Sequence, residues 1–187
     1  MSKKKVASVD EIITNKWLVE FDRKPLDKHP MYGFIVNFNE EFTLVHRFDR
    51  ELFILDGYSV FPNAAVKKCR VFDEETYFLS EVIQAKKIVP KALPKVSISS
   101  WPEILQSVSG CFPLLVVETG RLHKNECYIG KVTEIRKKSF KQQEMDTDAV
   151  WYGFTKYKFE DVTMISFGGL YESTLALVNA EREKSEQ

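Results

Sequence analysis

Branched and aromatic residues recur along the chain in short runs that are separated by polar residues, glycine or proline, a pattern typical of β-strands. The polar pair Asn39-Glu40 separates two such runs and suits a tight connection. Asp56-Gly57 predicts a hairpin turn, because glycine accepts the positive φ of primed turns. The predicted strands are residues 17–21, 31–38, 41–48, 58–61 and 66–72 in the first half, and 114–117, 128–135, 139–145, 150–157 and 162–167 in the second.

A short helix is predicted before each set of strands. Ser8 and Glu11 form a capping box, in which each side chain satisfies a free amide of the other residue. Ser100 is a second N-cap, and Pro102 stands in the first turn, where its missing N–H costs nothing. Apolar spacing predicts a further helix in each half, at residues 73–87 and 170–182.

Several residue spacings occur twice, which predicts an internal repeat. Gly57 and Val66 are nine residues apart, as are Gly153 and Val162, and aromatic residues lie at matching positions between them. The Ser8 and Ser100 helix starts also correspond. The chain is thus divided into a basic tail (1–7), a first repeat (8–88), a Pro/Lys linker (89–99), a second repeat (100–182) and a frayed tail (183–187).

Residues 33–44 and 60–69 resemble the two signatures of Sm-like proteins, and residues 130–135 and 157–165 are similar to the same pair. This resemblance implies a mainly β fold with short helices: two tandem Sm-like (SH3-like) five-stranded barrels, each preceded and followed by a helix. Gly33 and Gly130 would permit the bend of each sheet. Sm-like proteins usually form rings that hold single-stranded RNA. Asn39 matches the acid or amide of the first signature, whereas Lys67-Lys68 replaces an arginine-glycine pair common in the family.

Charge and cysteine content narrow the classes of function. Lys+Arg and Asp+Glu are equal at 27 each, so no long-range field favours a polyanion or an anionic membrane. Cys69, Cys111 and Cys127 have neither the even number of a disulfide framework nor a Cys-x-x-Cys spacing, and we expect reduced, partly buried thiols. No apolar run is long enough to span a bilayer, and we expect a cytoplasmic protein.

No catalytic, metal-binding or cofactor-binding motif is present in the sequence. His123 and Cys127 lie four residues apart, but a metal needs three or four converging ligands, and we expect no cofactor. Basic residues alternate with aromatic ones in two segments, a pattern that favours binding of single-stranded nucleic acid. With Asn39, the candidate RNA-binding residues are Lys67, Lys68, Arg70, Arg136, Lys137, Lys138 and Lys141.

The sequence therefore predicts a non-enzymatic binding or adaptor protein that acts through protein–protein interaction, with a protein partner or as a homodimer. Single-stranded RNA binding through the basic segments is an alternative. An enzyme acting on a small molecule is a third class, which would require a pocket with converging polar groups between the two halves.

Overall fold

The computed structural model describes residues 7–123 and 126–185, so the predicted basic tail lies almost wholly outside the described residues. The first half consists of α1 (Val9–Asn15), β1 (Leu18–Asp22), β2 (Met31–Phe38), β3 (Phe42–Asp49), β4 (Ile54–Pro62), η1 (Asn63–Ala65), β5 (Lys68–Phe72) and α2 (Phe78–Ala85). The second half consists of α3 (Trp101–Ser109), β6 (Leu115–Glu118), β7 (Cys127–Ile135), β8 (Ser139–Met145), β9 (Trp151–Lys158), η2 (Phe159–Asp161), β10 (Met164–Phe167) and α4 (Leu170–Ser185).

The predicted helix starts are confirmed at α1 and α3. Ser8 and Glu11 form both hydrogen bonds of the capping box, and Ser100 Oγ accepts from the Glu103 amide. α4 starts at the predicted residue and continues to Ser185. Among the residues that the structure describes, no helix combines the length and the apolar character that a membrane span requires.

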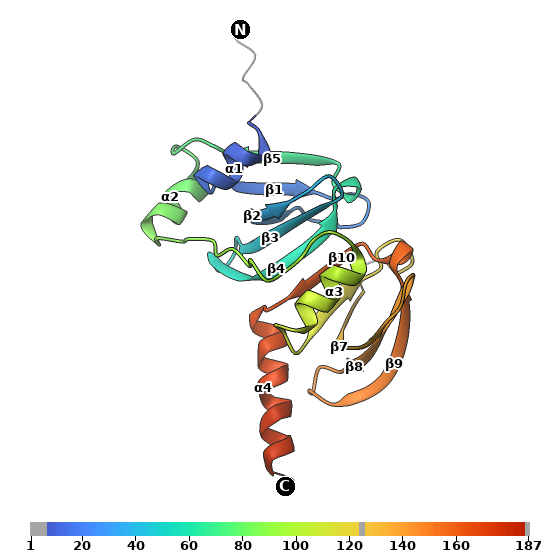
Figure 1. Ribbon diagram of the computed structural model, residues 1–187. Helices are drawn as coiled ribbons and strands as arrows, with labels where there is room; N and C mark the ends of the chain where they lie inside the picture. The colour runs from blue at the N-terminus through green and yellow to red at the C-terminus, as the bar shows by residue number, and fades with distance from the viewer. Residues whose placement is uncertain (1–6, 124–125, 186–187) are drawn as a thin grey trace.

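In the part of the chain that the structure describes, all the strands belong to one open antiparallel sheet of ten strands, in the order β5-β1-β2-β3-β4-β10-β6-β7-β8-β9 (Figure 1). The mainly β composition is as predicted, but the two closed barrels are not formed. In the first half, closure would require β4 and β5 to meet. The outer edge of β4 pairs instead with β10 of the second half, so β5 and β9 remain at the two ends of the sheet.

The two halves share their strand order and their irregularities. The β2–β3 register shifts between Ile35 and Asn37, and the β7–β8 register shifts between Val132 and Glu134, 97 residues later. The β3–β4 and β8–β9 pairs shift at positions with the same separation. The short 3-10 turns η1 and η2 follow β4 and β9 in the same way. Because a bulge bends a strand at a defined point, both halves of the sheet bend at corresponding places.

Asp56-Gly57 does not form the predicted hairpin turn, because both residues lie inside β4 and the connection from β3 is made by residues 50–53. Gly57 nevertheless has the positive φ that suggested a turn, at 66°. A Cβ atom at this position would lie 2.5 Å from the amide nitrogen of Gly169. Glycine is therefore required where the backbones of the two halves approach each other.

The β4–β10 pair, called the seam below, joins the halves. Tyr58 lies opposite Phe167, and their rings stack with centroids 5.9 Å apart. Next to them, the buried hydroxyls of Ser59 and Ser166 are hydrogen-bonded at 2.7 Å. Backbone pairing, ring contact and a side-chain hydrogen bond thus all cross the seam.

The largest hydrophobic core is also common to both halves. α3, which precedes the strands of the second half, contributes Trp101, Ile104, Leu105 and Val108. Residues of β3 and β4 from the first half complete the same cluster, namely Phe42, Leu44, Tyr58 and Val60. The two halves therefore form one structural unit, whatever the origin of the repeat.

The segment predicted as a linker is packed onto the sheet, and we call residues 91–98 the strap. The Lys91 amide donates to Nδ1 of His46 at 3.0 Å, and the Tyr58 hydroxyl donates to the Lys91 carbonyl oxygen at 3.2 Å. At the other end, Asn39 Nδ2 donates to the Ile98 carbonyl oxygen at 2.8 Å. Both ends of the strap are thus held by side chains of the first half.

Candidate functional site

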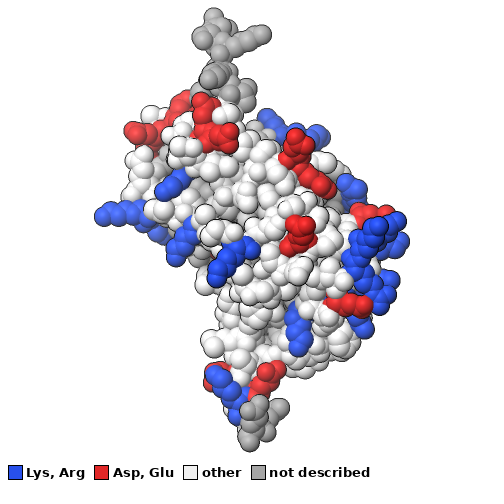
Figure 2. Space-filling model, in the orientation of Figure 1, with Lys and Arg blue, Asp and Glu red and all other residues white. Residues whose placement is uncertain are grey.

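The predicted RNA-binding residues lie in two separate places. Lys67, Lys68 and Arg70 lie in or next to β5, at one end of the sheet. The 136–138 turn between β7 and β8, together with Lys141, lies near the other end. Figure 2 shows Lys and Arg side chains concentrated on the side of the molecule where Figure 1 places β9. The fold therefore does not assemble the two basic segments into one continuous surface.

Asn39 is occupied by contacts within the protein. Its Oδ1 accepts from the amides of Glu41 and Phe42, at 2.9 and 2.7 Å, and its Nδ2 donates to the strap. These bonds close the β2–β3 turn, where the sequence predicted a tight connection. Both the side-chain oxygen and the side-chain nitrogen of Asn39 are thus engaged within the protein.

Arg70 is likewise engaged within its own half. Its guanidinium lies over the rings of Phe72 and Tyr77, 4.9 and 5.4 Å from their centroids. Such contacts hold a cation close to an aromatic face by its quadrupole. β5 thus presents exposed lysines, but its adjacent rings are already covered by Arg70.

The second half has a different arrangement, on the face of the β7–β9 strands that is turned away from the core. Lys141 Nζ lies 4.6 Å from the ring centroid of Phe154, and Lys131 Nζ lies 4.5 Å from that of Trp151. The Phe154 side chain is 57% exposed. We call this surface, consisting of Lys131, Lys141, Trp151, Phe154 and Lys156, the lysine-aromatic face.

The register explains why these side chains share one face. Gln143 of β8 lies opposite Phe154 of β9 and opposite Lys131 of β7, while Lys141 lies opposite Lys156. Side chains directly opposite each other on paired strands project from the same face. The sequence alone does not show these cross-strand neighbours, because they depend on two bulges that shift the register.

β9 is also a free edge. Among the described residues it pairs only with β8, and it ends the sheet. The Phe159 amide donates to the Lys138 carbonyl oxygen, and antiparallel ladder bonds recur at every second residue. The amides of Phe154, Lys156 and Lys158 and the carbonyls of Phe154 and Lys156 must then point away from β8, whereas the Lys158 carbonyl is the N-cap acceptor of η2. An extended segment could bond to them without disturbing the existing sheet.

The opposite side of β9 is fixed to the interior. The hydroxyls of Tyr152 and Tyr157 donate to Glu144, at 2.6 and 2.5 Å. Burial by itself would raise the pKa of Glu144, but hydrogen bonds from Tyr152, Tyr157 and Thr155 outweigh it and lower that pKa. The same bond to Glu144 raises the pKa of Tyr152 to about 12. β9 is therefore an edge with a well-anchored inner side.

A pocket of about 370 Å³ lies along this inner side of β9. Its lining is mostly neutral, with the Leu122 and Tyr128 side chains facing residues of β9. The full lining is Thr119, Leu122, His123, Tyr128, Thr155, Lys156, Tyr157, Lys158 and Asp161. A free backbone edge, a lysine-aromatic face and a partly apolar pocket thus meet at one strand.

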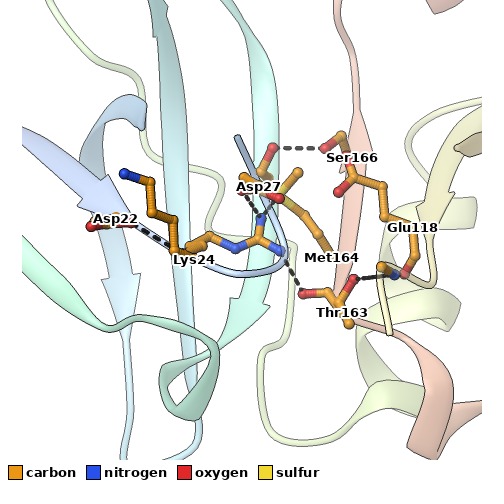
Figure 3. A network of polar contacts seen from close by, with 10 residues as sticks. Asp22, Lys24, Asp27, Glu118, Thr163, Met164 and Ser166 are labelled. Atoms are coloured by element: carbon orange, nitrogen blue, oxygen red, sulfur yellow. Dashed lines mark hydrogen bonds and ion pairs between the residues drawn. The ribbon is translucent and has the colours of Figure 1, made fainter. Parts of the chain in front are cut away.

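A second polar region, which includes Asp27, Glu118 and Thr163, lies beside the seam (Figure 3). Arg23 is 1% exposed, and its guanidinium lies 3.4 Å from the Asp27 carboxylate. It also donates to the carbonyl oxygen of Thr163 at 3.2 Å and contacts the Met164 sulfur at 2.6 Å. Burial lowers the pKa of Arg23 and raises the pKa of both Asp27 and Glu118. This buried cation connects the β1–β2 loop to β10.

A cavity of about 710 Å³ opens next to Arg23 and is lined from both halves. The residues around it are Asp27, His29, Pro30, Met31, Tyr32, Arg47, Phe48, Asp49, Arg50, Glu51, Glu118 and Met164. Acids and bases are mixed in this lining, so no single ligand charge is favoured. Within residues 7–123 and 126–185, no group of three or more His, Cys, Asp or Glu side chains could hold a metal ion.

The three cysteines and His123 were also considered in the sequence analysis. Cys69, Cys111 and Cys127 are free, as predicted; all three residues are accessible to solvent, and the thiols of Cys69 and Cys127 are also partly buried. Burial raises the pKa of the Cys69 and Cys127 thiols, which disfavours the reactive thiolate. His123 lies 3.8 Å from Glu126 at the surface.

Sequence reasoning predicted the strand at residues 150–157 but not that β9 is a free edge of the sheet, and it missed Arg23. The alternation of Phe154, Lys156 and Lys158 is a usable signal, because exposed rings and lysines at every second position are typical of an edge strand. Arg23 gives no such signal, since its partner Thr163 is 140 residues away.

Comparisons with protein-family models, with curated proteins and with solved structures found no match for this chain.

Proposed function

We propose that this protein is a non-enzymatic binding module that takes up an extended segment of a partner protein along the edge of β9. The observation that carries the proposal is the free edge itself, with the outward amides of Phe154, Lys156 and Lys158 and the outward carbonyls of Phe154 and Lys156. Addition of a strand to an exposed sheet edge is a common mode of peptide recognition. Main-chain bonds supply affinity and the side chains on either face supply specificity.

The setting of β9 supports this function. The Glu144 bonds anchor the strand, so little order has to be gained when a partner binds. The exposed ring of Phe154 offers apolar area next to the open backbone. We also infer that the halves, residues 8–88 and 100–182, are divergent Sm-like repeats, which the shared strand order and the recurring bulges support.

Single-stranded RNA binding is a second candidate, favoured by the rings of Trp151 and Phe154 beside lysines on one sheet face. Base stacking on aromatic rings, combined with phosphate neutralisation, is a general mode of single-strand recognition. Lys131 and Lys141 already lie over these rings, so a base would have to displace them. For this reason we place RNA second.

The edge can be tested by selecting displayed random peptides on the full-length protein and on two variants. Lys156→Pro removes an outward N–H without removing a β8 ladder bond, whereas Lys156→Thr keeps that N–H and removes only the charge. We expect the wild-type protein and Lys156→Thr to select binding peptides and Lys156→Pro to lose them. Circular dichroism should show that all three proteins are folded. Equal binding of the selected peptides by Lys156→Pro would contradict the proposal.

A further inference from the structure

The free edge at β9 carries several lysines, which limit what can bind there. Lys156 and Lys158 lie on β9, and Lys158 is only weakly paired with Glu160 at 3.4 Å. The turn between β7 and β8 brings the Lys137 and Lys138 side chains to the same end of the sheet. The exposed face of this edge is therefore basic, although the chain as a whole has no net charge.

A second copy of the chain does not fit this edge. The other free edge, β5, has exposed Lys67, Lys68 and Arg70. Pairing β9 with β5 of another copy, or with a second β9, would place like charges on neighbouring strands. Like charges directly opposite each other in a sheet are destabilising. Lysines on an edge are also a recognised means of preventing edge-to-edge association.

The two sides of β9 differ in what they offer to an added strand. On the outer face a partner's side chains would lie beside Phe154, Lys156 and Lys158. On the inner face they would lie over the pocket lined by Leu122 and Tyr128. Successive side chains of a strand point to opposite faces, so alternate positions of the partner meet these two environments.

On the basis of the proposed function, we infer that the segment bound at β9 is an acidic strand of a partner protein. Its carboxylates alternate with apolar side chains. The carboxylates lie on the outer face beside Lys156 and Lys158. The apolar side chains lie on the inner face, in the pocket beside Leu122. The partner is thus defined by an alternating acidic and apolar pattern rather than by net charge alone.

Three synthetic peptides of the length of β9 test this inference, with valine alternating with glutamate, threonine or lysine. Binding to the full-length protein is measured by fluorescence anisotropy at low and at near-physiological salt. We expect the valine-glutamate peptide to bind about tenfold more tightly than the valine-threonine peptide at low salt, and the difference to shrink as salt is added. The valine-lysine peptide should bind most weakly.

A charge reversal provides the matched variant. Lys156→Glu keeps the backbone edge and is expected to reverse the order, favouring the valine-lysine peptide. Equal affinities for the three peptides, or an unchanged order in Lys156→Glu, would overturn the inference. If all three peptides nevertheless bind the wild-type protein and fail to bind Lys156→Pro, the proposed function stands without the acidic preference.

The remaining outcomes are also decisive. If none of the three peptides binds the wild-type protein, the inference fails, and the proposed function fails with it only if the selection from random peptides also yields no binder. Tighter binding of a short oligouridine than of any peptide, weakened to the same extent by Lys156→Thr and by Lys156→Pro, would assign the lysine-aromatic face to RNA. A concentration-dependent dimer in sedimentation experiments that Lys156→Pro abolishes would assign the edge to a second copy of the chain.

Discussion

The guanidinium of Arg23 donates to the main-chain oxygen of Thr163 at 3.2 Å, a bond between residues 140 positions apart. Thr163 itself is held in the second half, where its amide donates to the Glu118 carbonyl oxygen at 2.8 Å. The β1–β2 loop is thereby fixed to the strand that pairs with β4. Arg23 thus joins the two halves directly beside the seam, which joins them as well.

Loss of Arg23 should weaken the fold. Arg23→Ala is expected to lower the free energy of unfolding by about 3 kcal/mol, because the carboxylates of Asp27 and Glu118 lose a nearby cation in a buried setting. The difference in unfolding free energy between the wild-type protein and Arg23→Ala should be larger at pH 8 than at pH 5, since Asp27 and Glu118 can be protonated in the variant at the lower pH. Urea unfolding at both pH values measures this difference.

Two further substitutions control this prediction. Arg23→Met refills the space with apolar atoms and should recover part of the loss. Lys24→Ala changes an exposed neighbour in the same loop and should stay within about 0.5 kcal/mol of the wild-type protein. A similar loss in Arg23→Ala and Lys24→Ala would show that the buried cation has no special role.

Asp56 caps a helix of the other half. Its Oδ1 accepts from the amide of Leu170 at the start of α4, at 2.7 Å. Asp56→Ala should cost about 1 kcal/mol of stability, as is usual for loss of a capping oxygen, and the first turn of α4 should exchange its amide hydrogens faster. Asp56→Asn keeps an acceptor and should cost less. Unchanged hydrogen exchange in α4 after Asp56→Ala would refute the cap.

Gly57 and Gly153 occupy corresponding positions in the repeated spacing but differ in environment. At Gly57, φ is 66° and a Cβ atom would lie 2.5 Å from the Gly169 nitrogen, whereas a Cβ at Gly153 would meet nothing within 4 Å. Gly57→Ala should therefore destabilise the protein by about 3 kcal/mol or more, and Gly153→Ala by less than about 0.5 kcal/mol. Thermal unfolding of the two variants gives the comparison, and equal melting temperatures would argue against a tight seam.

His46 should make stability depend on pH. Burial, with a smaller effect from Lys91, lowers the pKa of His46 from 6.5 to about 4. The unfolded chain then binds more protons than the folded one between these values, so stability falls as pH decreases from about 6.5 to about 4. The full loss corresponds to roughly 3 kcal/mol. Protonation would also remove the acceptor for the Lys91 amide.

The titration of His46 is isolated by comparing variants. His46→Gln does not titrate in this range, so its unfolding free energy should lack the drop that the wild-type protein shows. His29→Gln, at an exposed position, should lose unfolding free energy at low pH as the wild-type protein does. Chemical denaturation at several pH values between 7 and about 4 separates the two cases. The same pH dependence in His46→Gln as in the wild-type protein would exclude His46 as its source.

Local patterns in the sequence predicted the strands well. Residues 31–38 and 139–145 were predicted with the bounds that β2 and β8 have, because alternation and β-branching act within a few residues. The positive φ of Gly57 was anticipated too, but a hairpin and a close backbone approach require the same glycine. Only the distant Gly169 decides between them.

Contacts between segments that are distant in the sequence could not be predicted from local sequence patterns. Nothing near Ser59 indicates that Ser166 lies beside it, since this depends on which free edge β4 meets. The lysine-aromatic face depends in the same way on the register of three strands, which two bulges set. The predicted basic residues were recognised individually, but the sequence could not show that β5 and the β7–β8 turn lie near opposite ends of the sheet.

The shared core around α3 means that the halves cannot be separated as independent fragments. A chain cut after residue 99 would leave Phe42, Leu44 and Val60 without the apolar side chains of α3. The second fragment would lose the residues that cover α3 from the other side. Neither fragment would then be an informative reagent for binding studies, and co-expressed fragments would have to reassemble before either edge of the sheet took its native form.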